Sequence, residues 1–183
     1  MDVAQVNSDN WTIKDILNLP EGKHVEIIKG TAYDMAPPNP KHQQISFSIA
    51  RKIADYIDKN NGECAVYPAP FGVFLSDEDN TYLEPDISVV CDKSKISDRG
   101  CEGAPDWIIE IVSLSTRSMD YLRKLYQYKQ KGVRLYWIVD PLSGYISVYD
   151  FEGDTMTQYG FTDSIPVTIY DGFVIDMSSV IVP

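Results

Sequence analysis

A chain of 183 residues, of which 44% are hydrophobic and 23% charged, has the composition of a globular protein and is long enough to bury a sizeable core. We predict one domain over residues 1–183. The net charge of −11 argues against a protein that coats nucleic acid non-specifically. No apolar run approaches the roughly 18 residues of a membrane span, and the first residues lack the basic start and apolar stretch of a signal peptide.

The cysteines and the basic residues narrow the class of protein further. Three cysteines, Cys64, Cys91 and Cys101, are an odd number without CxxC spacing, which argues against a disulfide framework and against a zinc site. This predicts a cytoplasmic protein in a reducing compartment. The segment from Arg117 to Arg134 carries six basic residues and one aspartate. It is either a solvated helix face or a phosphate-contacting one, and the sequence leaves both open.

Predicted elements in the first part of the chain are two helices and a hairpin. A short helix is predicted over residues 11–19, capped by Asp9 or Asn10. Residues 25–35 indicate two strands that turn at Lys29-Gly30. The clearest helix spans residues 40–59, with Asn39 as its cap and proline in its first position. Its buried stripe recurs every four residues, at Ile45, Ile49, Ile53 and Ile57.

Strands and a helix alternate in the centre of the chain. The predicted elements are a strand over 86–91, a strand over 107–112, a helix over 116–131 and a strand over 135–139. A strand, a helix and a strand joined this closely predict a crossover with parallel strands, and Gly132 suits the helix end. Antiparallel strands are predicted over 145–149 and 155–159. The predicted fold is α/β, with a mixed β-sheet flanked by helices and extra C-terminal antiparallel strands.

Two acids interrupt apolar strands of this centre. Glu110 lies inside the run Trp107-Ile108-Ile109-Glu110-Ile111-Val112, and Asp86 opens a second apolar run. A carboxylate buried there is costly unless a cation or hydrogen-bond donors meet it. Strand alternation puts Glu110 on one face with Ile108 and Val112, and Asp86 can face the same point if the strands are neighbours. The acids are candidate ligands of a hard ion such as Mg²⁺, and a structural ion pair is the competing interpretation.

Lys124 is the leading candidate for a cation beside these acids. Asp120 and Lys124 are four residues apart and share the predicted polar face of their helix, opposite Leu122, Leu125 and Tyr128. Spacing alone favours an exposed surface pair worth a few tenths of a kcal/mol over a functional lysine.

Pro85-Asp86 followed by Glu110-Ile111-Val112 resembles the PD-(D/E)XK nuclease signature. Further matching segments lie at residues 25–30, 38–42, 99–106, 110–116 and 132–141, with Asp120, Lys124 and Tyr128 between them. Together they resemble the Uma-two family of proposed restriction endonucleases, a domain family of unknown function. The resemblance implies a restriction-endonuclease-like core and metal-dependent cleavage of phosphodiester bonds.

By this resemblance Asp86, Glu110 and the carbonyl of Ile111 would bind Mg²⁺, with Mn²⁺ able to substitute. The usual position of the catalytic lysine is occupied by Val112, and the resemblance moves that role to Lys124. Leu114 is a smaller departure, where the family usually has proline.

Two other positions match the family. Glu26 matches an acid in its first hairpin, and would either approach the metal or pair with a lysine. His42 matches a histidine near a helix start, but it continues the isoleucine stripe, which favours a hydrogen-bonded packing role over a chemical one.

Three functions fit these observations. The first is a Mg²⁺-dependent endonuclease acting on DNA, with Asp86, Glu110, Lys124 and Glu26 in its catalytic site. The second is an inactive nuclease-like domain that binds nucleic acid or protein. The third is a subunit whose edge strand pairs with a second copy, and a homodimer would also suit cleavage of both strands. The sequence leaves the choice between DNA and RNA open.

Overall fold

The computed structural model describes residues 5–113 and 119–180, with side chains from residue 10 onward. These residues form three sheets. The first has the strand order β1 (Gln5–Asp9), β3 (Thr31–Asp34), β2 (Val25–Ile28), β6 (Thr81–Leu83), β5 (Val73–Ser76), β9 (Gly100–Glu102) and β8 (Ile96–Ser97). The second has the order β13 (Thr155–Gly160), β12 (Tyr145–Asp150), β11 (Leu135–Asp140), β10 (Trp107–Ile111), β7 (Ile87–Val90) and β4 (Ala65–Pro68). The third pairs β14 (Ser164–Pro166) with β15 (Val174–Asp176).

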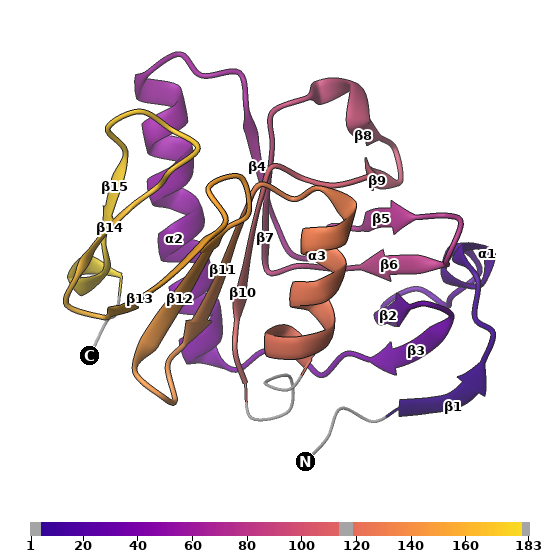
Figure 1. Cartoon of the computed structure of the whole chain (residues 1–183). Coiled ribbons are helices and arrows are strands. Elements are labelled where there is room, and N and C mark those ends of the chain that lie inside the picture. Colours follow the sequence, from indigo (N-terminus) through magenta and orange to yellow (C-terminus); the bar gives the residue numbers. More distant parts are fainter. Residues whose placement is uncertain (1–4, 114–118, 181–183) are drawn as a thin grey trace.

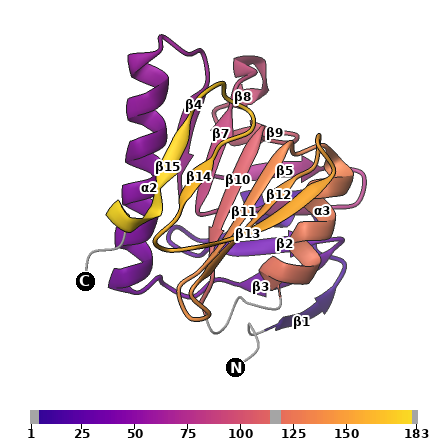
Figure 2. The same ribbon diagram turned by 60° about the vertical axis from the view of Figure 1, so that its left-hand side comes forward.

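Helices lie on both sides of the second sheet (Figures 1 and 2). The elements are α1 (Ile13–Leu17), α2 (Pro40–Lys59), the π-helical segment η2 (Met119–Lys124), α3 (Leu125–Lys131), and short 3₁₀ turns η1 (Lys93–Lys95) and η3 (Met177–Ser179). Helix α2 and the β14–β15 pair cover one face of the second sheet, and α3 and the first sheet lie on its other side. Within the described part of the chain, no helix combines the length and apolar character of a membrane span.

The central strands β7, β10 and β11 of the second sheet are buried on both faces, as their apolar sequences predict. Trp107 and Ile109 pack with α2 and the C-terminal segment, whereas Ile108 and Val112 pack toward α3 and the first sheet. Strand β10 pairs in parallel with β11, with Glu110 opposite Ile138. The predicted α/β fold with a mixed sheet is confirmed.

Local signals locate α2 and the β2–β3 hairpin correctly. Asn39 Oδ1 accepts a hydrogen bond from the His42 backbone N at 2.9 Å, and the helix begins at Pro40. Lys29 and Gly30 both have positive φ, 50° and 78°, as a two-residue hairpin turn requires. The predicted cap of α1 is wrong, because Thr12 occupies that position and Asp15 accepts from its backbone N.

The predicted orientation of the central helix is also wrong. Asp120 and Lys124 are buried and Leu122 is 70% exposed, the reverse of what was expected at these positions, whereas Tyr128 is buried as expected. Residues 119–124 are π-helical, and a π turn rotates successive side chains less than an α turn does. The predicted helix start at residue 116 lies outside the described residues, and Gly132 ends α3 with φ of 92°.

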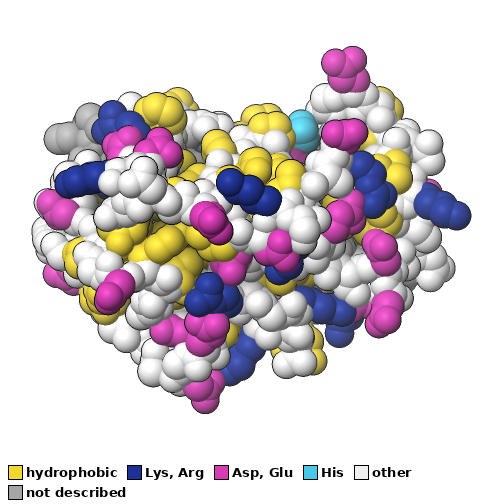
Figure 3. Space-filling model, turned by 90° about the horizontal axis from the view of Figure 1, so that it is seen from above, with side chains coloured by type: hydrophobic (Ala, Val, Ile, Leu, Met, Phe, Trp, Pro, Cys, Tyr) yellow, Lys and Arg dark blue, Asp and Glu magenta, His cyan; other side chains and the backbone are white. Residues whose placement is uncertain are grey.

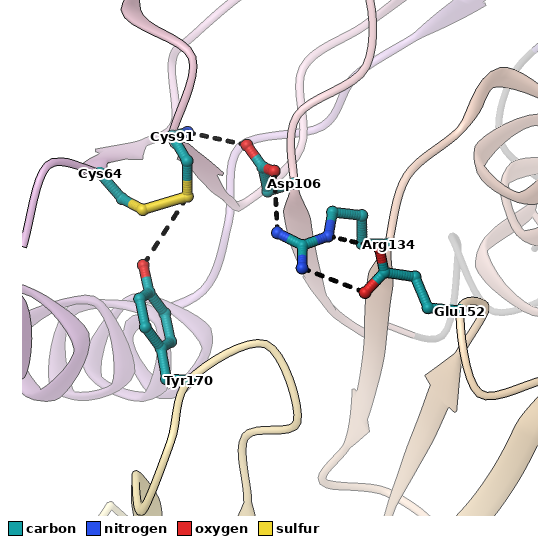
Figure 4. The surroundings of a disulfide bond; sticks show 6 residues. All are labelled: Cys64, Cys91, Asp106, Arg134, Glu152 and Tyr170. Atoms are coloured by element: carbon teal, nitrogen blue, oxygen red, sulfur yellow. Dashed lines mark hydrogen bonds and ion pairs between the residues drawn. A yellow bond between two sulfur atoms is a disulfide. The ribbon is translucent and has the colours of Figure 1, made fainter.

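The expectation of no disulfide is wrong, because Cys64 and Cys91 are bonded to each other (Figure 4). Ala65 pairs with Val90 across β4 and β7, so one residue further the two cysteines are opposite each other. A cysteine count cannot detect this pairing. Cys101 is free and buried. The cysteine argument for a reducing compartment therefore no longer holds, and a cytoplasmic location stays a prediction.

Candidate active site

The two acids of the central strands lie on neighbouring strands. Strands β7 and β10 are antiparallel with Ile87 opposite Ile109, so continuing this register by one residue brings Asp86 opposite Glu110. The Asp86 carboxylate accepts a hydrogen bond from the Ile111 backbone N at 2.7 Å. The sheet thereby brings together the expected carboxylates and the backbone of Ile111.

Lys124 reaches Glu110 from the helix on that side of the sheet. Its Nζ lies 3.0 Å from Glu110 Oε1, 2.9 Å from Glu26 Oε1 and 3.6 Å from Asp120 Oδ1. Lys124 and Glu110 are only 4% and 3% exposed. The interpretation of Asp120 and Lys124 as a surface pair is therefore wrong. Of the two options for Glu26, the structure shows the contact with a lysine.

Further side chains hold this cluster in place, although no role there was expected for them from the sequence. Tyr128, one α-helical turn beyond Lys124, donates its hydroxyl to Glu110 Oε1 at 2.8 Å. Tyr136 donates its hydroxyl to the Asp120 carbonyl at 3.1 Å. Glu26 Oε1 also accepts from the Glu84 backbone N at 3.0 Å. The i, i+4 spacing of Lys124 and Tyr128 is the signal that could have identified the tyrosine.

His42 has a polar contact in addition to its place on α2. Its Nε2 lies 3.1 Å from Asp86 Oδ2. Burial lowers the pKa of His42, but the hydrogen bond and charge of Asp86, the Ile111 backbone and the charge of Asp120 together raise that pKa above its ordinary value. His42 therefore has the polar partner that a hydrogen-bonded packing role requires, and this partner is Asp86.

Within the described residues, the buried acids of this cluster outnumber its one lysine. Three carboxylates, those of Glu26, Glu110 and Asp120, surround one ammonium. Burial lowers the pKa of Lys124, but the three acids outweigh it and keep the pKa well above its usual value, so the side chain is charged. Burial raises the pKa of Glu110, Lys124 opposes this, and the charges of Asp120, Asp86 and Glu26 raise it further.

This excess of acid fits a divalent cation. Buried charges are normally paired or bound to a metal, and crowded carboxylates are stabilised when a cation lies between them. Within the described residues, no three His, Cys, Asp or Glu side chains form a ready-made metal cluster. The expected set of Asp86, Glu110 and the Ile111 carbonyl has only two side chains, and Mg²⁺ commonly binds one or two carboxylates while keeping several waters.

Comparisons with known proteins identify the family and the fold. The model of the Uma2 family, described as "Putative restriction endonuclease", matches residues 13–178. A solved structure described as a "putative nuclease belonging to DUF820", from Anabaena variabilis ATCC 29413, superposes with a TM-score of 0.76 at 20% sequence identity, covering 93% of this chain and 97% of that one. At this identity the likeness shows a shared fold. Among curated proteins no match is found.

Proposed function

This chain belongs to the Uma2 family, and we propose that it is a divalent-metal-dependent endonuclease that hydrolyses phosphodiester bonds in DNA. The observation that carries this proposal is the 3.0 Å contact between Lys124 Nζ and Glu110 Oε1 inside a buried cluster with an excess of carboxylates. Buried ionisable groups that perturb one another's pKa are typical of catalytic centres.

In this proposal Asp86, Glu110 and the carbonyl of Ile111 hold Mg²⁺, for which Mn²⁺ can substitute. An ion held by these residues would supply charge stabilisation for the attacked phosphate and activation of water. Lys124 has three N–H donors, of which Glu26 and Glu110 take two. The third orients the attacking water, and the ammonium charge offsets the charge of the phosphate.

Glu26 and His42 act in this proposal as positioning residues. Glu26 Oε1 accepts from both Lys124 and the Glu84 backbone N, which ties the lysine to strand β2. His42 holds Asp86 from the first turn of α2. Neither residue needs to touch the substrate for its loss to lower the rate.

A specific observation favours a second candidate, a nuclease-like domain that binds nucleic acid or protein without cutting. Both expected metal ligands already have partners, because Asp86 contacts His42 and the Ile111 backbone N, and Glu110 contacts Lys124 and Tyr128. A metal would have to share these carboxylates or displace a partner. The two candidates therefore differ in metal binding as well as in cleavage.

Cleavage is tested with supercoiled plasmid in Mg²⁺ or Mn²⁺. We expect the wild type to relax and linearise the plasmid, and Glu110→Gln and Lys124→Met to lose this activity. Arg134→Gln is the matched control, because it breaks an ion pair with Asp106 at the other end of β10 and should keep activity. Equal cleavage by all variants would indicate a contaminant and remove the proposed site.

Metal binding is measured separately by titration calorimetry without nucleic acid. We expect heat of Mn²⁺ binding with the wild type and its loss in Asp86→Asn. Metal binding without cleavage of DNA or RNA would favour the second candidate. Absence of metal binding in the folded wild type would refute the metal-dependent mechanism.

A further inference from the structure

An open hollow lies between the β2–β3 hairpin and the helix formed by η2 and α3. Its volume is about 640 Å³, within the usual range of small-molecule sites. Ile28 and Leu122 give it apolar surface, and its polar and aromatic lining consists of Lys29, Thr31, Tyr33, Arg123, Tyr126 and Gln127. Nothing in the proposed catalytic chemistry uses this hollow.

The hollow is cationic in a strongly acidic protein. Lys29 and Arg123 line it, and none of its lining residues is an acid. Three other cations of the basic segment are paired with acids among the described residues: Lys129 with Asp154, Lys131 with Asp79, and Arg134 with Asp106 and Glu152. Figure 4 shows the contacts of Arg134, and Figure 3 shows basic and acidic side chains intermixed on the face seen from above.

Within the described residues, neither Lys29 nor Arg123 forms an ion pair with a carboxylate. The basic segment was expected to be either solvated or in contact with phosphate. Ion pairing with surface acids favours the solvated interpretation for Lys129, Lys131 and Arg134. Arg123 keeps its charge available for an anion. The hollow accordingly suits a negatively charged ligand.

Aromatic rings accompany both cations. Lys29 Nζ lies 5.2 Å from the centre of the Tyr126 ring, and Arg123 Cζ lies 5.2 Å from that of Tyr33, whose hydroxyl it also contacts. Tyr126 is 55% exposed, so its ring is accessible to a ligand. Cations that hold phosphates beside rings that stack on bases are the elements of single-strand binding sites.

The side-chain oxygen of Gln127 provides independent support for a ligand in the hollow. Its side chain is 3% exposed, and its Oε1 is buried without a hydrogen-bond partner among the described residues. A buried polar atom without a partner is destabilising, and such atoms are rare in folded proteins. Because Gln127 lines the hollow, a polar edge of a ligand there can supply the hydrogen bond.

The hollow borders the acid cluster. Tyr33 is paired with Glu26 across the hairpin, and Arg123 directly precedes Lys124 in the chain. We propose that the hollow binds an unpaired nucleotide of the substrate strand, with its base against Tyr126, its phosphate between Lys29 and Arg123, and its base edge at Gln127. This inference rests on the proposed function, because it makes the substrate single-stranded or locally opened nucleic acid. A duplex keeps its bases paired and stacked, so it cannot supply such a base.

The test measures binding in EDTA, so that it does not depend on metal or on cleavage. The probe is a short fluorescein-labelled oligothymidylate, compared with its duplex and with an abasic strand of equal length, by fluorescence anisotropy. We expect the single strand to bind most tightly. Tyr126→Ala should weaken it by roughly 5- to 100-fold, the range for loss of one base–aromatic stack. Arg123→Gln should reduce the slope of log affinity against log salt by about 0.7, as for one lost phosphate contact.

Controls separate this site from general surface effects. Phe47 on α2 is 67% exposed and has Arg51 6.0 Å above its ring, so Phe47→Ala removes a comparable aromatic–cation pair and should leave the affinity unchanged. Gln127→Met should keep or raise the thermal midpoint while weakening the oligothymidylate complex, which a purely structural role would not do.

The inference is overturned if the duplex or the abasic strand binds as tightly as the oligothymidylate, if no strand binds, or if Tyr126→Ala and Phe47→Ala have equal affinity. A hollow that serves a protein partner would give such a result. These outcomes leave cleavage and Mn²⁺ binding untouched, so they are distinct from failure of the proposed function.

Discussion

Replacing Lys124 with methionine removes the cation of the acid cluster while nearly keeping the side-chain volume. The ammonium lies 2.9 and 3.0 Å from Glu26 and Glu110, and 3.6 Å from Asp120. At an effective dielectric constant of 20, each contact near 3 Å contributes about 5 kcal/mol of attraction before desolvation. Desolvation offsets most of this, and removing one partner of a buried pair typically costs about 3–5 kcal/mol. We expect the free energy of unfolding to fall by that amount.

Urea unfolding followed by tryptophan fluorescence measures this loss, because Trp107 and Trp137 are fully buried. A double-mutant cycle with Glu110→Gln isolates the coupling between the two residues. The double variant Lys124→Met/Glu110→Gln should recover part of the loss, since it no longer buries that uncompensated acid. The partly exposed pair of Arg134 is the control, and Arg134→Gln should cost about 1 kcal/mol or less.

A loss below about 1 kcal/mol in Lys124→Met, with an unchanged dependence on urea, would refute this reasoning. It would mean that water or protonation neutralises the acids and that the lysine contributes little to the fold. A double variant less stable than either single variant would likewise contradict the coupling, because charge removal would then not relieve the cluster.

Two further predictions concern groups remote from the acid cluster. Burial raises the pKa of the Cys101 thiol to about 11, so little thiolate is present at pH 8. Iodoacetamide should therefore modify Cys101 only after unfolding. A mass adduct on Cys101 of the native protein would contradict this expectation. Ile53→Ala should cost about 2–5 kcal/mol in urea unfolding, because Ile53 is fully buried between α2 and the sheet. Exposed Phe47→Ala, measured alongside, should stay within about 0.5 kcal/mol of the wild type.

Local sequence patterns predicted the elements that caps, turns and helical periodicity define. Helix α2 begins at Pro40 and ends at Lys59, as the Asn39 cap and the four-residue isoleucine period indicate. The β2–β3 hairpin follows from Lys29-Gly30, because both residues take positive φ. The apolar runs of β10 and β11 predicted a doubly covered sheet, since no other environment buries so many consecutive apolar side chains.

The orientation of the lysine-bearing helix is not a local property, and here the sequence pattern was misleading. Burying Leu122 would gain about 1.5–3 kcal/mol, which favours the predicted face. Leaving Glu110 and Glu26 buried without Lys124 costs more than this. The helix therefore exposes the leucine and buries the lysine, with a π-helical segment over residues 119–124. The spacing of residues along the helix cannot show that Glu26 on β2 and Glu110 on β10 lie beside it.

The net charge of −11 and the proposed activity on a polyanion are compatible only if cations are concentrated where the substrate binds. Surface acids pair with Lys129, Lys131 and Arg134 of the basic segment, whereas Lys29 and Arg123 line the hollow and Lys124 lies among the buried carboxylates. A phosphate near Glu110 would be repelled unless a divalent ion offsets the local excess of acid. Metal binding and substrate binding should therefore be coupled: an uncleavable strand should bind more tightly in Ca²⁺ than in EDTA, and Glu110→Gln should reduce that difference. Equal affinity in both buffers would show that strand binding at the hollow does not depend on metal binding at the acid cluster, although the two sites are adjacent in the fold.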